Sequence, residues 1–220
     1  MPDVAVVPSE HFNTILFTGD GTSNRDITGT GFNPDLNWLK MRSSADNHVV
    51  TDSLRGTNHL HTNTTSADSD AGYPALVTDG FRVRGGNYNN SGYTFVAWQW
   101  KANGSGSSNT DGDVTSTVSA NVDAGFSIVS WSGNNGVQTI GHGLSKAPEI
   151  IIRKSRSRGY GAVVTGSEWP ASCAVLLYSG CCAAALLSTS ESADSTPCLH
   201  NSGRCKKTKI TPQRQNQKIN

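Results

Sequence analysis

The chain has 220 residues, enough for one large domain or two domains of about 100 residues, each with a hydrophobic core. Its formal net charge of +1, with 35% hydrophobic and 16% charged residues, gives no overall electrostatic reason to expect nucleic-acid binding. The first ten residues, MPDVAVVPSE, lack the basic start and apolar run of a signal peptide. We therefore expect synthesis in the cytoplasm, with no signal peptide and no membrane insertion.

The two ends of the chain differ sharply in composition. Residues 1–149 hold 8 Lys and Arg against 14 Asp and Glu, whereas residues 150–220 hold 10 against 3. The cysteines all lie in the second part, at Cys173, Cys181, Cys182, Cys198 and Cys205. Such a break is typical of a change of domain or of origin.

The first elements expected in chain order are short strands separated by turns. FNTILFT (12–18) is rich in β-branched and aromatic residues and ends in the turn TGDG (18–21), which combines glycines with an aspartate that bonds turn backbone. Gly29 and Gly31 mark a second turn. A strand, LNWLKMR (36–42), follows a proline, which is tolerated at the start of a strand but not in its middle.

Two further strands follow before a polar stretch. DGFRVR (79–84) alternates apolar and charged residues, which predicts one buried and one solvated face. YTFVAWQWK (93–101) places Trp98 and Trp100 on one face. Residues 105–113 are rich in Gly, Ser and Asn, as in a flexible linker. No long stretch has helical periodicity, so we predict an all-β fold, an antiparallel β-sandwich of jelly-roll or lectin-like type.

Two parts of the chain read alike. Phe12 aligns with Phe126 and Leu36 aligns with Ile150, both at an offset of 114 residues. Similar residues at a fixed offset indicate an internal repeat. Two copies are too few for a solenoid, so we expect two similar modules or two equivalent halves of one sandwich.

The repeat predicts a division of the chain into four parts. A first sandwich module covers residues 11–104, the linker covers 105–113, and a partial second copy starts at 114 and ends at 157. Residues 158–220 depart from the repeat and carry the cysteines and the basic residues. We interpret this tail as a translated frameshift or a recombined end, and we expect it to be poorly ordered.

The order of the motifs resembles a known family. They are FTGDGTSNRDITGTGF, FNPDLNWLKMRSS, DSLRGTNHL, LVTDGFRV and YTFVAWQWKANG, after which the pattern starts again at STVSANVDAGFSIVSWSGN. This order is similar to an uncharacterised repeat domain of phage virion and tail-fibre-like proteins, common in marine viral sequences. The resemblance implies a non-enzymatic structural β-module on a virion or tail appendage, with no catalytic residues to carry over.

The resemblance also implies partners and a location. Other virion or fibre subunits are the expected partners, host surface glycans are a further possibility, and neither nucleic acid nor membrane is expected. A homotrimer follows only by analogy at the level of the fold. The expected location is the phage particle, after synthesis in the host cytoplasm.

Three tryptophans support an alternative function. Trp38, Trp98 and Trp100 could stack on sugar rings if they are exposed, as in a carbohydrate-binding module that recognises host glycans. The same residues could instead belong to the hydrophobic core, which the alternation of each strand also permits. Binding to a glycan array distinguishes the two interpretations.

Four aspartates in polar loops are candidate calcium ligands. Asp20, Asp26, Asp111 and Asp113 offer the carboxylate oxygens that Ca²⁺ prefers. Turns in which aspartate bonds the local backbone use the same residues without a metal. Apart from calcium, we expect no cofactor.

Other chemistry has weaker support. A glycan hydrolase, the third functional hypothesis, needs two carboxylates across a cleft, and no such pair or Ser-His-Asp set stands out, so we do not expect an enzyme. His59 and His61 could bind zinc or copper from one face of a strand, but no third ligand lies nearby in the sequence, so we favour an exposed polar strand. The basic end, residues 204–218, resembles a nucleic-acid patch by charge alone, and we favour a solvated or accidental tail because no aromatic residues lie around it.

Overall fold

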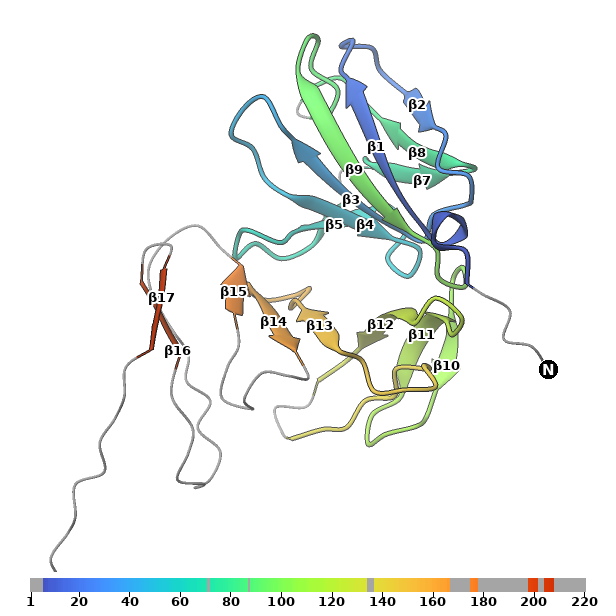
Figure 1. Cartoon of the computed structure of the whole chain (residues 1–220), viewed down its shortest axis with the longest axis vertical. Helices are drawn as coiled ribbons and strands as arrows, with labels where there is room; N and C mark the ends of the chain where they lie inside the picture. The colour runs from blue at the N-terminus through green and yellow to red at the C-terminus, as the bar shows by residue number, and fades with distance from the viewer. Residues whose placement is uncertain are drawn as a thin grey trace, which may run out of the picture.

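The protein is built of β-strands joined by turns (Figure 1). The computed structural model describes residues 6–70, 72–86, 88–133 and 137–166, and the backbones of three later strands. Within these residues there is no α-helix, and one 3-10 turn, η1 (Pro8–Glu10), precedes the first strand. None of the described residues forms a helix that could span a membrane. The strand pairs are antiparallel, which confirms the all-β, antiparallel prediction.

The first part of the chain forms two sheets that stack as a β-sandwich (Figure 1). Its strands are β1 (Phe12–Thr18), β2 (Arg25–Thr28), β3 (Leu36–Met41), β4 (Val49–Asp52), β5 (Asn58–His61), β6 (Ser69–Asp70), β7 (Ala75–Val77), β8 (Gly80–Val83) and β9 (Thr94–Trp100). The large sheet has the order β1-β9-β3-β4-β5-β6, and the small sheet has the order β2-β8-β7. The last strand of this part, β9, therefore lies between the first strand and β3.

The hydrophobic core lies between these two sheets. Phe81 and Val83 of β8 are fully buried and share one cluster with Leu39 of β3 and with Phe95 and Ala97 of β9. Their alternation along each strand places every second side chain between the sheets. Full burial of a large apolar side chain stabilises the fold by roughly 1.5–3 kcal/mol, so this cluster supplies much of the driving force for the sandwich.

The chain enters and leaves this sandwich at the same point. Phe12 of β1 lies opposite Trp100 of β9, and one residue further out the amide of Lys101 donates a 2.8 Å hydrogen bond to the carbonyl of His11. The side-chain amide of Asn121, in the second part of the chain, donates to the Lys101 carbonyl at 3.1 Å. The entry and exit strands are thus fastened to each other and to the second part of the chain.

The second part of the chain forms smaller sheets. Its strands are β10 (Ser107–Asn109), β11 (Ser116–Asn121), β12 (Phe126–Trp131), β13 (Ile150–Arg153), β14 (Ala162–Gly166), β15 (Val175–Leu177), β16 (Cys198–Asn201) and β17 (Arg204–Lys207). They group as β10-β11-β12, β13-β14-β15 and β16-β17. The segment predicted as a linker thus contains β10. A Cβ on Gly106 would lie 2.7 Å from the carbonyl oxygen of Val118, so this segment packs closely on β11.

Strand positions in the two parts correspond at one offset. β12 starts 114 residues after β1 (126 against 12), and β13 starts 114 residues after β3 (150 against 36). The pair Leu36↔Asp52 of β3 and β4 becomes Ile150↔Gly166 of β13 and β14 when both members shift by this offset. The boundary predicted at residue 157 falls within this hairpin. Of the tail predicted over residues 158–220, most of the part after residue 166 lies outside the described residues.

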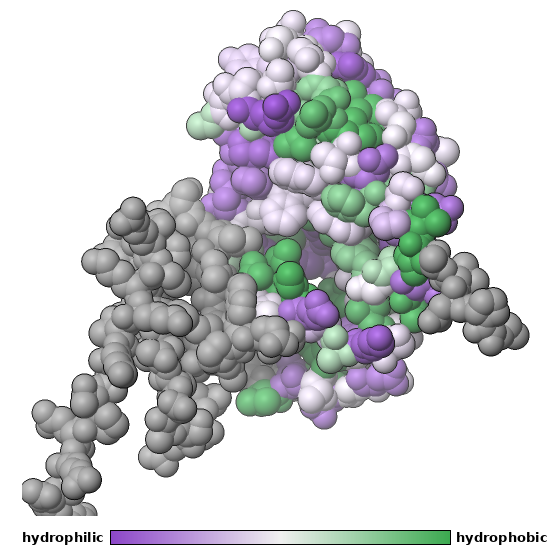
Figure 2. Space-filling model, in the orientation of Figure 1, coloured by the Kyte–Doolittle hydropathy of each residue, from purple (hydrophilic) through white to green (hydrophobic). Residues whose placement is uncertain are grey.

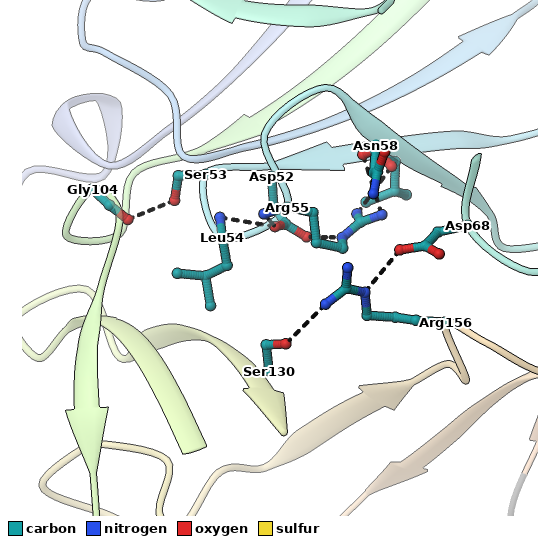
Figure 3. A network of polar contacts seen from close by, with 10 residues as sticks. Asp52, Ser53, Leu54, Arg55, Asn58, Asp68, Gly104, Ser130 and Arg156 are labelled. Atoms are coloured by element: carbon teal, nitrogen blue, oxygen red, sulfur yellow. Dashed lines mark hydrogen bonds and ion pairs between the residues drawn. The ribbon is translucent and has the colours of Figure 1, made fainter. Parts of the chain in front are cut away.

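A set of polar contacts lies where the two parts of the chain meet, and we call it the junction network (Figure 3). Asp52 and Arg55 form an ion pair of 2.7 Å at its centre, with only 8% and 4% of their side chains exposed. Two backbone carbonyls accept further hydrogen bonds from the Arg55 guanidinium, those of Val50 at 3.1 Å and Asn58 at 3.4 Å. The motif DSLRGTN thus closes the turn from β4 to β5.

The second half of the junction network belongs to the segment after β13. Arg156 pairs with Asp68 at 2.8 Å and donates to the Ser130 hydroxyl at 3.4 Å (Figure 3). The ammonium group of Lys154 donates to the carbonyl of Ser66 at 2.8 Å. These bonds hold β13 against the loop between β5 and β6 of the first sandwich.

Candidate functional site

One face of the large sheet carries aromatic side chains away from the core. In register, Trp98 of β9 lies between Thr14 of β1 and Trp38 of β3, and Trp100 lies opposite Phe12. All three tryptophans that the sequence suggested as ligand contacts therefore lie on this face. We call the surface formed by Phe12, Leu16, Trp38, Trp98 and Trp100 the aromatic face.

Trp38 and Trp98 form an edge-to-face pair in the middle of the aromatic face. Their ring centroids are 6.2 Å apart and their planes are inclined by 80°. The indole N–H of Trp38 donates a 3.0 Å hydrogen bond to Nδ1 of His48. Burial lowers the pKa of His48, with a smaller effect from Lys40, which favours the neutral ring that accepts this bond. Both indoles are partly buried, and they do not form one flat platform.

Trp100 connects the aromatic face to the second part of the chain. Its ring lies 4.9 Å from that of Phe12 and 6.0 Å from that of Phe126, with which it stacks at an interplanar angle of 21°. Aromatic pairs of this kind add about 0.5–1.5 kcal/mol beyond the area that they bury. Trp100 therefore has a structural role at the start of β12.

The exposed part of the aromatic face belongs mainly to β1. Leu16 is 61% exposed and Phe12 is 38% exposed. Figure 2 shows a hydrophobic area over β1 and β9, and it is surrounded by more polar surface. Our sequence reasoning did not single out these two residues, although the alternation in FNTILFT places them with Thr14 on one face.

A row of buried polar side chains crosses the opposite face of the same sheet. Successive strands pair Gln99 with Asn37, Asn37 with Thr51 and Thr51 with His59. Gln99 accepts a hydrogen bond from the hydroxyl of Thr30. Both side-chain atoms of Asn37 and single atoms of Thr51, His59 and Gln99 have no hydrogen-bond partner among the described residues. No periodicity in the sequence marked this row as functional, because each member occupies a normal core position of its strand.

The first two calcium candidates are engaged by the protein itself. Asp20 accepts hydrogen bonds from the amide and hydroxyl of Thr22 and from the side chain of the fully buried Asn89, at 2.7–2.9 Å. These bonds lower the pKa of Asp20 to about 2. Asp26 forms a two-pronged ion pair with Arg82 on the neighbouring strand β8, at 2.5 and 2.9 Å.

The other two candidates lie in the second part of the chain, away from the first two. Asp113 accepts from the amide and hydroxyl of Thr139 at 2.9 and 2.7 Å, and Asp111 is bonded to Asn109. The four carboxylates are therefore not gathered at one point. Among the described residues, no group of three His, Cys, Asp or Glu is placed to hold a metal ion.

The two histidines of β5 lie side by side, His59 buried and His61 partly buried. The rings of His59 and His61 are 5.1 Å apart, but His59 is only 4% exposed, so the prediction of an exposed polar strand was wrong for this residue. His59 faces the small sheet because it continues the buried row from Thr51. Burial is the main cause that lowers the pKa of both histidines.

A hollow in the second part of the chain bears on the hydrolysis hypothesis. A shallow hollow of about 400 Å³ is lined by Asp111, Ile140, Gly141, His142, Gly143 and Leu144. Asp111 is the carboxylate in this lining, and Asn109 already donates to it at 3.1 Å. Glycan hydrolysis requires a second carboxylate across the cleft.

Comparison with known proteins finds one family. The model of a family described as a domain of unknown function (DUF7483) matches residues 7–213, which covers both parts of the chain. No curated protein and no solved structure matches the chain.

Proposed function

Because the chain belongs to the DUF7483 family, whose description assigns no function, we propose a function from the geometry of the molecule. The chain is a non-enzymatic structural module of a phage tail fibre or virion surface, made in the host cytoplasm. It packs against other subunits of the same particle, copies of this chain among them, through the aromatic face. The observation that carries this proposal is the exposure of Leu16 and Phe12 beside three tryptophans on an otherwise polar surface.

The chemistry of the aromatic face favours contact with protein. Aromatic residues are enriched at interfaces between proteins, and an exposed apolar patch rimmed by polar residues is typical of such a site. Within this face, Trp98 and Trp38 pack on each other. An interface on a regular sheet is also rigid, so little conformational entropy is lost when a partner binds.

The rest of the sandwich is suited to a structural role. Its turns are closed by internal hydrogen bonds, for example from the amides of Gly29 and Gly31 to the carboxylate of Asp79, at 3.1 and 2.6 Å. The turn after β1 is closed by Asp20 and Asn89. The motif resemblance to phage virion proteins supports the location, and the jelly-roll or lectin-like topology and the homotrimer belong to the same proposal.

Carbohydrate binding is the second candidate, because two indoles on the aromatic face are partly exposed. Trp38 and Trp98 could each stack on a sugar ring, with Lys40 close to them in the register of β3. The perpendicular arrangement of the two rings favours protein packing, since a flat sugar-binding platform needs rings that face one way. A glycan array with the wild-type chain and the Trp98→Ala variant tests this candidate; binding that the variant loses would establish it.

Self-association tests the leading proposal. We expect the mass measured by size exclusion with light scattering to rise with concentration for the wild-type chain. Leu16→Glu should remain monomeric, because it places a charge on the most exposed apolar residue of the aromatic face. The matched control is Val122→Glu, since Val122 is 50% exposed but lies outside the aromatic face. A wild-type chain that stays monomeric at every concentration, or equal behaviour of the two variants, contradicts the proposal.

A further inference from the structure

The edge of β13 that faces away from β14 has no strand paired to it among the described residues. β13 pairs with β14, and β12 pairs with β11, but the two strands do not pair with each other. We propose that the position between β12 and β13 binds an extended segment of another polypeptide, which adds as a strand antiparallel to β13. This inference goes beyond the proposed function and does not depend on the aromatic face.

In the first sandwich, the equivalent position is occupied by a strand. β3 and β4 pair in the register that β13 and β14 repeat 114 residues later, and β12 starts at the counterpart of the first residue of β1. In the first sandwich, β9 lies between β1 and β3 and pairs antiparallel with both. The described residues place no corresponding strand between β12 and β13.

The exposure of β13 agrees with an unfilled position. Ile150, Ile151 and Ile152 are 67%, 50% and 50% exposed, although isoleucine is among the residues most often buried. Asn37, the counterpart of Ile151 in β3, is fully buried between two neighbouring strands. An open apolar edge of this kind is a template for the addition of a strand.

Arg156 connects the two strands that border the position with each other and with the first sandwich. Arg156, which follows β13, donates to the hydroxyl of Ser130 in β12 at 3.4 Å and also pairs with Asp68 (Figure 3). Its carbonyl accepts from the amide of Asp68 at 2.8 Å. In the first sandwich the counterpart Arg42 donates its amide to Thr94 of β9 at 2.7 Å. A preformed position lowers the entropic cost of binding an extended chain.

Charge indicates which end of the bound segment lies beside the start of β13. Glu149 is the counterpart of Asp35, whose carboxylate accepts the amide of Ala102 at 2.7 Å just after β9 ends. Glu149 forms no ion pair among the described residues. The preferred segment therefore resembles YTFVAWQWK, with alternating aromatic and β-branched residues and a basic residue at its C-terminal end.

A labelled peptide of the sequence YTFVAWQWK, added to the full chain and followed by fluorescence anisotropy, tests this proposal. We expect saturable binding that a scrambled peptide of the same composition does not show. Ile152→Lys should weaken it about tenfold or more, because a lysine on the edge opposes strand addition. Val122→Lys is the matched control, since Val122 is equally exposed but lies in the turn between β11 and β12.

A second variant covers the case in which Ile152→Lys fails to fold. Glu149→Lys, on an exposed residue, should weaken the basic-ended peptide several-fold and leave the circular dichroism spectrum unchanged. The proposal is overturned if the chain binds no peptide, if the scrambled peptide binds equally, or if Val122→Lys weakens binding as much as Ile152→Lys. Self-association that Ile152→Lys abolishes, without peptide binding, would assign the position to a second copy of the chain and also overturn it.

Discussion

The junction network contains two Arg–Asp pairs with similar distances and different burial. Replacing each arginine in turn therefore shows how burial changes the contribution of an ion pair to the free energy of unfolding. Arg55 and Asp52 are 2.7 Å apart with 4% and 8% of their side chains exposed, whereas Arg156 and Asp68 are 2.8 Å apart with 44% and 16% exposed. Methionine keeps the packing of the aliphatic stem and removes the charge. Arg55→Met leaves a carboxylate buried without its counter-ion, and it also removes the donor to Val50.

The expected magnitudes follow from this difference in burial. Removing one partner of a buried pair costs about 3–5 kcal/mol, so Arg55→Met should lower the urea midpoint by about 1.5–2.5 M for a slope near 2 kcal/mol per molar. Arg156→Met should cost less than about 1 kcal/mol, because solvent screens an exposed pair. Urea unfolding followed by tryptophan fluorescence measures both. Equal shifts for the two variants, or a shift below about 0.5 M for Arg55→Met, would refute the reasoning.

Three further predictions concern stability. A Cβ on Gly80 would overlap the carbonyl oxygen of Ile27 on the paired strand, so Gly80→Ala should cost at least about 1–3 kcal/mol. A Cβ on Gly133 would meet only Oε1 of Gln138, at an ordinary contact distance of 3.6 Å, so Gly133→Ala should cost nothing measurable in the same urea titration. Asn37→Leu should raise the free energy of unfolding or leave it unchanged, because both polar atoms of Asn37 lack a protein partner among the described residues; a loss above about 1 kcal/mol contradicts this. Burial lowers the pKa of His59 below its ordinary 6.5. As the pH falls below 6.5, this histidine therefore binds a proton in the unfolded chain but not in the folded chain. Stability should therefore decline from pH 7.5 to 5.5 in thermal melts, His59→Asn should reduce the decline, and a flat profile for the wild-type chain would argue against it.

Local patterns in the sequence predicted the strands well where side chains alternate. FNTILFT and YTFVAWQWK became β1 and β9, because period-two alternation and β-branched or aromatic residues both favour a half-buried strand. The turn at TGDG is closed as expected by the carboxylate of Asp20. The same reasoning took residues 105–113 as a linker, although Ser107–Asn109 form β10. These three residues have no apolar side chain, and only their pairing with β11 makes them a strand.

Contacts between residues far apart in the sequence were beyond prediction from one sequence. Arg156 and Asp68 are separated by 88 residues, and nothing in the local sequence of either indicates the other. Similarly, the burial of His59 depends on its place opposite Thr51 in the sheet, and a period-two pattern cannot say which face lies inward when both carry polar residues. Alternation placed Trp98 and Trp100 on one face, but the position of Trp38 opposite Trp98 and the orientations of the rings required the structure.

The hydrogen bond between His11 and Lys101 has a consequence for how this module could be carried within a longer polypeptide. The chain enters the sandwich at residue 11 and leaves it at residue 101, and these two residues are hydrogen-bonded neighbours. The sandwich therefore adds almost no distance between the segments that precede and follow it. It could be inserted into a loop of another protein, or duplicated in tandem, without separating the flanking residues. A force applied between residues 11 and 101 would break the hydrogen bonds between β1 and β9 one after another, starting at this end of the pair. A fibre that contained such modules would therefore need other contacts to bear its load.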